Sequence, residues 1–141
     1  MDGSGPAGYS GTSLPRKLGA KAGSRVALVD APPDAEGLLV PWPEGAELVP
    51  LDDGEIDVVV FFATERAELA ARFAAIAECL TPAGALWIAW PKRSSGVDTD
   101  LTENVLRDVI LPSGLVDTKV CAIDATWSGL RFVRRREDRL R

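Results

Sequence analysis

The stretch from Ile56 to Trp90 reads IDVVVFFATERAELAARFAAIAECLTPAGALWIAW and decides the fold. It opens on a nearly continuous apolar run, which is typical of a parallel strand buried on both faces. We expect Thr64 to cap a helix from Glu65 to about Leu80, and a second buried strand over Ala85–Trp90 once Thr-Pro-Ala-Gly has ended the helix. Four apolar residues recur at helical spacing and predict that this helix packs on a sheet: Leu69, Phe73, Ile76 and Leu80.

Shorter elements precede this stretch. Arg25–Asp30 is apolar and β-branched and ends on an acid, which is typical of the first strand of a parallel sheet. We expect a helical turn over Ser13–Gly19, with Ser13 as its N-cap, one or two helical turns ending at Leu39, and a second strand near Glu47–Pro50.

A helix and two further strands follow it. Asp100 and Glu103 have capping-box spacing and predict a helix that ends at Ile110. The segments Leu115–Ile123 and Leu130–Val133 are rich in β-forming residues and predict an antiparallel hairpin. The element order therefore predicts an α/β fold: a three-layer, Rossmann-like, mostly parallel sheet of about six strands with a C-terminal antiparallel hairpin.

The length and composition suit one globular unit. The chain has 141 residues, of which 46% are hydrophobic and 26% charged. We expect a flexible leader over residues 1–12, one α/β domain over 13–136 and a charged tail over 137–141. Because neither a membrane-spanning run nor a secretory signal is visible, the expected location is the cytoplasm, with no membrane partner.

Histidine and cysteine narrow the chemistry. The chain contains no histidine, which excludes a triad with a histidine base and a histidine-ligated metal centre. Cys79 and Cys121 lie in segments predicted as helix and strand, without the spacing of a metal site or a redox motif. We therefore expect both thiols to be reduced, and we expect no metal site.

The net charge of −5 is unevenly distributed. The segment Asp30–Glu78 carries twelve acids against Arg66 and Arg72, which disfavours a nucleic-acid-binding face there. Residues Arg131–Arg141 carry six basic and two acidic side chains. We interpret this end as a final strand that runs into a solvated tail, in preference to a phosphate-binding arm.

The second half of the chain carries a recognisable pattern. A hydrophobic strand begins at Asp57, the segment LTPAGALWI (residues 80–88) follows the helix, and a hairpin comes last. These features resemble the later half of class I S-adenosylmethionine-dependent methyltransferases. The resemblance implies a glycine-rich turn after the first strand that holds the cofactor. Here Ala31-Pro32-Pro33-Asp34 stands there, and its prolines remove N–H donors and fix φ, so we expect a degenerate cofactor site, no bound cofactor and no active methyltransferase.

Most of the chain, from about Tyr9 to Asp138, also resembles a small, mostly actinobacterial family of domains of unknown function. The resemblance rests on KLG (17–19), WPK (90–92) with SGV (95–97), TDLTE (99–103), and parts of the segment 114–130. It implies no activity.

Ligands of an open α/β sheet bind beyond the carboxyl ends of its strands. The loop after Trp90 places two cations, hydroxyl groups and a glycine before a helix start, so we consider it a candidate anion site. In the alternative interpretation, the cations are solvated or paired with Asp98 and Asp100, and the polar side chains only cap the helix. The candidate residues are Lys92, Arg93, Ser94, Ser95, Gly96, Thr99 and Asp100.

Five further residues are candidates for the same cleft: Asp30, Thr64, Trp90, Asp124 and Trp127. Four carboxylates could act as general acid and base, with Lys92 stabilising negative charge, but each also has an ordinary capping or turn role: Asp30, Asp98, Asp100 and Asp124. Trp127 is either a core residue or an exposed anchor for a partner.

Two functional hypotheses follow. The favoured one is a non-catalytic domain that binds a protein partner or a small anionic metabolite through Lys92 and Arg93. The alternative is an enzyme that uses carboxylate and lysine chemistry in the cleft. Convergence of Asp30, Lys92 and Asp124 on one ligand position would favour the enzyme, whereas occupation of these groups by the protein itself would favour binding.

Overall fold

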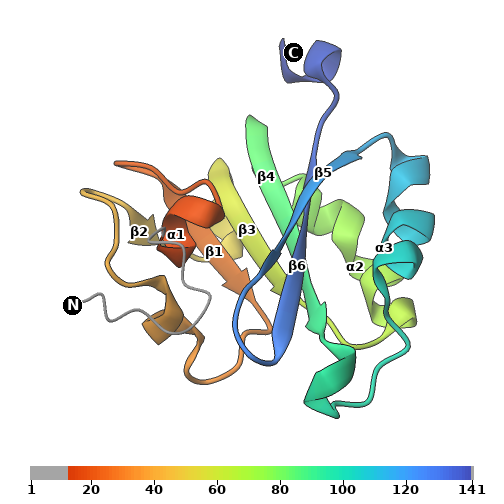
Figure 1. Ribbon diagram of the computed structural model, residues 1–141. Helices are drawn as coiled ribbons and strands as arrows, with labels where there is room; N and C mark the ends of the chain where they lie inside the picture. The colour runs from red at the N-terminus through yellow and green to blue at the C-terminus, as the bar shows by residue number, and fades with distance from the viewer. Residues whose placement is uncertain (1–12, 141) are drawn as a thin grey trace.

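A computed structural model describes residues 13–140, in which one sheet has the strand order β2-β1-β3-β4-β6-β5 (Figure 1). The first four strands of that order are parallel, β6 is antiparallel to β4, and β5 is antiparallel to β6. The predicted fold class is confirmed, including the six strands and the C-terminal hairpin. The leader predicted over residues 1–12 lies outside the described residues. The strands are β1 (Arg25–Val29), β2 (Glu47–Leu48), β3 (Ile56–Phe62), β4 (Leu80–Pro91), β5 (Val116–Ala122) and β6 (Trp127–Val133).

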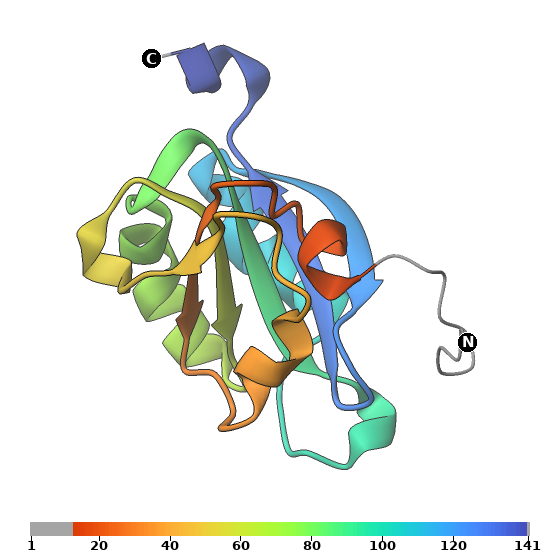
Figure 2. The same ribbon diagram turned by 90° about the vertical axis from the view of Figure 1, so that its left-hand side faces the viewer.

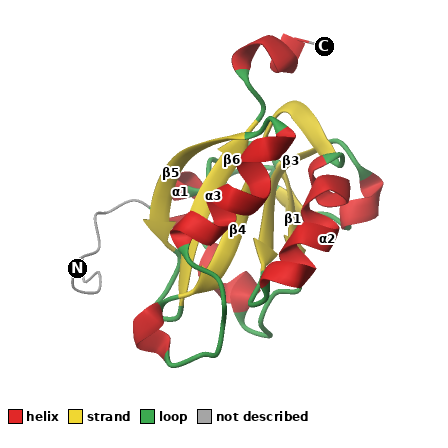
Figure 3. Cartoon of the chain, turned by 90° about the vertical axis from the view of Figure 1, so that its right-hand side faces the viewer, coloured by secondary structure: helices red, strands yellow, loops and turns green. Residues whose placement is uncertain are grey.

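Helices cover both faces of the sheet. The helices α2 (Arg66–Ala77) and α3 (Glu103–Ile110) lie side by side on one face (Figure 3). The short helix α1 (Leu14–Lys17) and a 3-10 turn over Ala35–Leu39 lie on the other face (Figure 2). Among residues 13–140, no helix combines the length and the apolar character needed to cross a bilayer.

The hydrophobic core has two layers, one on each side of the sheet. The apolar residues of the central strands and of the long helix are predicted to form one core, and all eight are buried, which confirms that α2 packs on the central strands: Val58, Val60, Phe61, Leu69, Phe73, Ile76, Leu86 and Ile88. They do not form one core, because successive strand residues point to opposite faces. Phe61, Leu86 and Ile88 face α2 and α3, whereas Val58 and Val60 face α1.

The boundaries of α2 and β4 differ from those predicted. The helix ends at Ala77, and β4 begins at Leu80, so the segment 81–84 belongs to the strand. Gly84 permits this, because a Cβ atom there would lie 2.9 Å from the carbonyl oxygen of Ile56 on β3. A glycine that seems to end a helix here allows two strands to approach closely.

Ser13 occupies the predicted N-cap position of α1, without a side-chain hydrogen bond. The other two predicted caps are wrong. Thr64 does not cap α2, whose N-cap residue is Glu65 without a side-chain bond. The helix α3 starts at Glu103, and its N-cap is Thr102, whose hydroxyl accepts a hydrogen bond from the N–H of Val105 at 3.2 Å. Asp100 instead accepts a hydrogen bond from the first N–H of α2, because the loop after β4 folds back over that helix.

Candidate functional site

The candidate residues gather at one edge of the sheet. Parallel strands β1, β3 and β4 end at this edge, and the turn from β5 to β6 lies there too, at the bottom of Figure 1. The N–H of Lys92 donates to the carbonyl of Thr126 at 2.7 Å and ties the loop after β4 to that turn. The topology therefore brings together residues that are far apart in the sequence.

Asp30 follows β1 and is held by α2. Its backbone has a φ of 56°, and its carboxylate forms an ion pair with Arg72. Arg72 also contacts Glu68 at 3.3 Å, and its guanidinium carbon lies 5.1 Å from the centroid of the Phe61 ring. The hydrogen bond to Asp30 raises the pKa of Arg72 above its ordinary value. Asp30 is thus engaged by a permanent cation of the same chain.

Hydrogen bonds within the chain shape the loop between β4 and α3. The hydroxyl of Ser95 donates to the carbonyl of Lys92 and accepts from the N–H of Val97. The hydroxyl of Thr99 donates to the carbonyl of Thr64 at 2.6 Å and accepts from the N–H of Leu101 at 3.0 Å. Ser95 and Thr99 therefore have structural partners in the loop.

Two of the other three candidate carboxylates are engaged as well, whereas Asp98 is exposed and lines an acidic pocket. Asp100 accepts the N–H of Arg66 at 2.7 Å, and one oxygen of Asp124 accepts the N–H groups of Thr126 and Trp127, both at 2.8 Å. Asp124 thus forms a side-chain turn at the start of β6, as its turn role predicted.

The tryptophans at this edge belong to the packed structure. Trp127 is half-buried and meets the Phe62 ring edge to face, with centroids 5.1 Å apart and planes at 87°. Trp90 is buried in the core layer beneath α3. The contact with Phe62 favours the core interpretation of Trp127 over the partner-anchor interpretation.

A pocket of about 360 Å³ opens between the end of β4 and the start of α3. Of the predicted residues, Trp90, Arg93 and Thr99 line it. The sequence interpretation missed the N-cap Thr102, which threonine's preference for that position could have revealed. Lys92, Ser94, Ser95, Gly96 and Asp100 are not among its lining residues. The remaining lining residues are Pro91, Val97, Leu101, Thr102 and Glu103.

A neighbouring pocket has a different character. It is lined by Thr64, Glu65, Ala67, Asp98, Thr99 and Asp100, and its charged side chains are all acidic. Within the described part of the chain, no three acidic or cysteine side chains are grouped closely enough to hold a metal ion.

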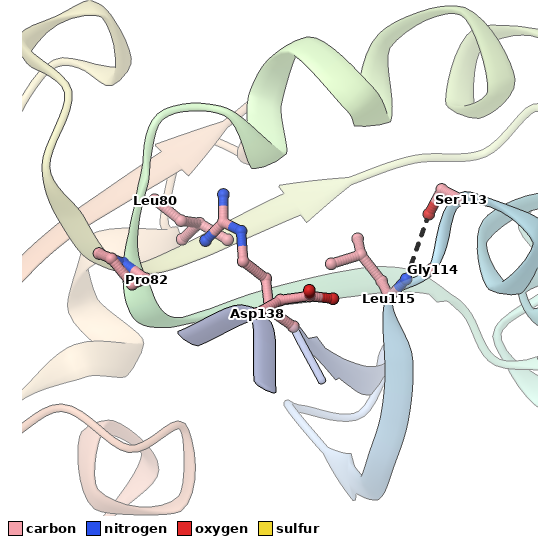
Figure 4. A pocket seen from close by; sticks show the side chains of 7 residues that line it. Leu80, Pro82, Ser113, Gly114, Leu115 and Asp138 are labelled. Carbon is pink, nitrogen blue, oxygen red and sulfur yellow. Dashed lines mark hydrogen bonds between the residues drawn. The ribbon is translucent and has the colours of Figure 1, made fainter. Parts of the chain in front are cut away.

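A further pocket of about 450 Å³ lies at the opposite edge of the sheet (Figure 4) and was not predicted. The guanidinium of Arg134 lines it and donates to the carbonyls of Ala77 and Thr81 at 3.0 and 2.9 Å. Arg134 thereby caps the C-terminus of α2, a structural role that accounts for its position. The other lining residues are Leu80, Pro82, Ser113, Gly114, Leu115 and Asp138.

The two cysteines, Cys79 and Cys121, are free thiols. Burial raises the pKa of Cys121 above its ordinary value, and the nearby Lys17 and Lys119 oppose this rise only in part. Burial therefore disfavours the thiolate, which is the nucleophilic form of cysteine.

Comparison with known proteins identifies the class of fold. A methyltransferase of Aquifex aeolicus, described as SAM-dependent, is 12% identical with a TM-score of 0.61, covering 83% of this chain and 85% of that one. A Sulfolobus solfataricus protein described as a type 11 methyltransferase is 14% identical with a TM-score of 0.61, covering 86% and 89%. The magnesium protoporphyrin IX methyltransferase of Synechocystis, solved with bound SAM, is 11% identical with a TM-score of 0.55, covering 86% and 74%.

These structures show that the chain has the methyltransferase-like Rossmann fold, which confirms the resemblance at the level of the fold. No family model and no curated protein matches the sequence. The resemblance to the actinobacterial family therefore stays a prediction.

Proposed function

We propose that the protein is a non-catalytic binding domain of methyltransferase-like fold, which takes a small anionic ligand in the pocket between β4 and α3. One observation carries the proposal: three of the four candidate carboxylates are engaged by groups of the chain itself, and the fourth, Asp98, lines the neighbouring acidic pocket. Asp30 pairs with Arg72, Asp100 caps α2, and Asp124 holds its own turn. A general acid or base needs a carboxylate oxygen within reach of the ligand, and none of these four carboxylates lines the pocket between β4 and α3.

The turn after β1 supports the absence of methyl transfer. Pro32 and Pro33 lack N–H groups, and the N–H of Ala35 is bonded to the carbonyl of Pro32 at 3.0 Å. The residues present do not fit S-adenosylmethionine, because the turn offers few free donors and no glycine that would allow a close approach of the backbone.

Charge and shape support an anionic ligand. Arg93 is exposed and lines the pocket, and it takes part in none of the ion pairs between described residues. The negative charge of Glu103 is countered by Arg107 at 2.5 Å. The first turn of α3 adds N–H groups without intrahelical partners, which favour an anion. Trp90 and Leu101 supply an apolar wall, so the ligand we expect combines a phosphate or carboxylate with a small apolar body.

The test is a titration with inorganic phosphate, sulfate and short carboxylic acids, followed through the amide signals of residues 95–103 by NMR. We expect these amides to shift. Arg93→Ala should weaken binding more than Lys92→Ala, because a guanidinium can bind an oxyanion through two hydrogen bonds. Lys92→Ala is the matched control, since it removes one positive charge from a residue that does not line the pocket. Unmoved amides would show that the loop is only a helix cap.

A second measurement tests the proposal that the protein does not bind a methyl donor. Calorimetry with millimolar S-adenosylmethionine should detect no binding. A dissociation constant below about 100 μM, a binding free energy of more than roughly 5 kcal/mol, would contradict the proposal.

A further inference from the structure

Three kinds of group at the outer edge of β5 have no partner in the described structure: outward backbone groups, a cationic side chain and an apolar side chain. β5 is the last strand of the sheet and is bonded only to β6, so half of its N–H and C=O groups face outward. Along this edge an exposed cation lies on one face of the strand, and an exposed apolar side chain lies on the other.

The basic face contains two like charges at one register position. Lys119 of β5 lies directly opposite Arg131 of β6. Like charges in this position repel each other, and a fold stabilised only by its own contacts would favour an acid at one of them. Arg131 donates to the hydroxyl of Thr118 at 3.1 Å, and no ion pair between described residues includes Lys119 or Arg131.

More positive charge surrounds this pair. Burial lowers the pKa of Arg131, and the nearby Arg139 lowers it further. Lys17, in the last turn of α1, lies near Cys121 on the same face of β5. Lys119 and Arg131 thus have two further cations near them, Lys17 and Arg139, although the net charge of the protein is −5.

The opposite face of the same strand carries an exposed apolar side chain, and the one charged residue there, Asp117, is paired with Arg107 of α3. Val120 alternates with Lys119 and is 47% exposed, one of three large hydrophobic residues that are exposed in the described part of the chain. An extended segment beside β5 would therefore meet cations on one face and an apolar side chain on the other.

We propose that the edge of β5 binds an extended segment of a protein partner in which acidic and apolar residues alternate, as a seventh strand of the sheet. Its acidic side chains would contact Lys119 and Arg131, its apolar side chains would cover Val120, and its backbone would pair with the outward groups of β5. This inference is independent of the anion pocket, which lies at the end of β4.

Other occupants fit less well. If two copies of the chain paired through this edge, the cations around Lys119 of one copy would face the same cations of the other copy and repel them. A long nucleic acid would meet the acidic remainder of the chain, since residues 1–130 carry a net charge of −9. A lysine on an edge strand can also serve only to prevent edge pairing, and the experiment has to separate that role from binding.

The probe is a ten-residue peptide of alternating glutamate and valine, titrated into the whole protein and followed by NMR and calorimetry. We expect the amide signals of Val116–Ala122 to shift. Lys119→Glu should weaken binding by about tenfold or more, because it turns an attraction into a repulsion. Arg66→Glu is the matched control, since it changes the net charge equally from an exposed position on α2, on the other face of the sheet. Arg131→Gln gives a second variant that keeps most of the half-buried side chain.

Three results would overturn the proposal. If no peptide binds, the role of Lys119 is only to prevent pairing of another strand with this edge. If a peptide with proline in place of each valine binds equally well, the attraction is electrostatic and strand addition is wrong, because proline cannot donate to the ladder. If a single-stranded oligonucleotide of equal charge binds at this edge and the peptide does not, the partner is a nucleic acid.

Discussion

The β3–α2–β4 region and the β1–β2 region are both strand–connection–strand units, but they differ in how much structure they contain. β3 and β4 pair along most of their length, and the twelve-residue helix α2 connects them. β1 and β2 share only two registered pairs, and the connection holds a five-residue 3-10 turn. The sheet can tolerate this reduction because β1 also pairs with β3, from Val26 to Val29.

The difference bears on function. In many Rossmann-like folds the helix after the first strand presents its N-terminus to an anionic ligand. Here a 3-10 turn and Pro32-Pro33 follow the first strand, so the first region presents no N-terminus of an α-helix there. The β3–α2–β4 region contains one full helix and leads into another, α3, beside whose N-terminus the proposed anion pocket lies. The proposed site thus lies on the side of the molecule that has full helices, away from the 3-10 turn.

The largest expected effect tests whether the second region carries the stability. Phe73→Ala in α2 should reduce the free energy of unfolding by about 3 to 5 kcal/mol, because its buried ring packs beneath the helix. Leu39→Ala in the 3-10 turn should cost about 2 kcal/mol, near the low end for a buried leucine, because Leu39 already borders a small apolar gap that can collapse. Urea unfolding measures both. Equal losses, or a loss below about 1 kcal/mol for Phe73→Ala, would show that the comparison is wrong.

A second effect concerns a hydrogen bond between the second region and the segment that precedes β1. The indole N–H of Trp87 on β4 donates to the carbonyl of Leu18 after α1 at 2.9 Å, in the buried layer. Trp87→Phe removes the donor and leaves that carbonyl unsatisfied, which should cost about 1 to 3 kcal/mol. Trp42→Phe is the control, since the indole N–H of Trp42 has no acceptor among residues 13–140. If both substitutions have the same effect, the bond does not link α1 to the sheet.

The sequence was sufficient to predict the second region and most of the topology. The apolar run 56–62 and the helical spacing of Leu69, Phe73 and Ile76 are local patterns, so one sequence contains them. The start of β4 was misplaced because Thr81-Pro82-Ala83-Gly84 has the composition of a turn, whereas its pairing with β3 depends on contacts with a distant strand. Local propensity yields to tertiary contacts at such positions.

A smaller effect tests the strained position in the first region. Asp30 has a φ of 56°, which aspartate tolerates better than alanine, and which glycine adopts without strain. Asp30→Ala and Asp30→Gly both remove the exposed ion pair with Arg72, so that loss cancels in the comparison. We expect Asp30→Ala to be less stable than Asp30→Gly by about 1 kcal/mol, measured by urea unfolding. Equal stability of the two variants would indicate that the turn after β1 relaxes.

The candidate site was predicted only in part. The loop after Trp90 was selected because strand ends and helix starts are visible in the sequence, and Arg93 and Thr99 of this loop line a pocket. The partners of its side chains were not visible. Asp100 binds the N–H of Arg66, and Thr99 binds the carbonyl of Thr64, so both contacts join residues that are more than thirty positions apart. A side chain that caps a distant helix cannot be distinguished from a ligand-binding one by spacing alone.

The smallest effect concerns the ion pair between α3 and β5, which follow the second region in the chain. Arg107 donates to Asp117 at 2.8 Å, and this hydrogen bond lowers the pKa of Asp117 below its ordinary value. A carboxyl whose pKa is lower in the folded state stabilises the fold above its unfolded pKa, about 3.9 for aspartate, and loses this contribution as the pH falls through its folded pKa. Asp117→Asn should therefore be slightly less stable than the parent protein at pH 7, and the difference should shrink as the pH falls below about 4. Asp108→Asn is the control, because Asp108 lies next to Arg107 on α3 and forms no ion pair among the described residues. Urea unfolding at several pH values measures the difference. A difference between Asp117→Asn and the parent that does not change with pH would show that the bond to Arg107 does not persist in solution, and that the apolar side chains of α3, led by Leu106 and Ile110, hold it to the sheet.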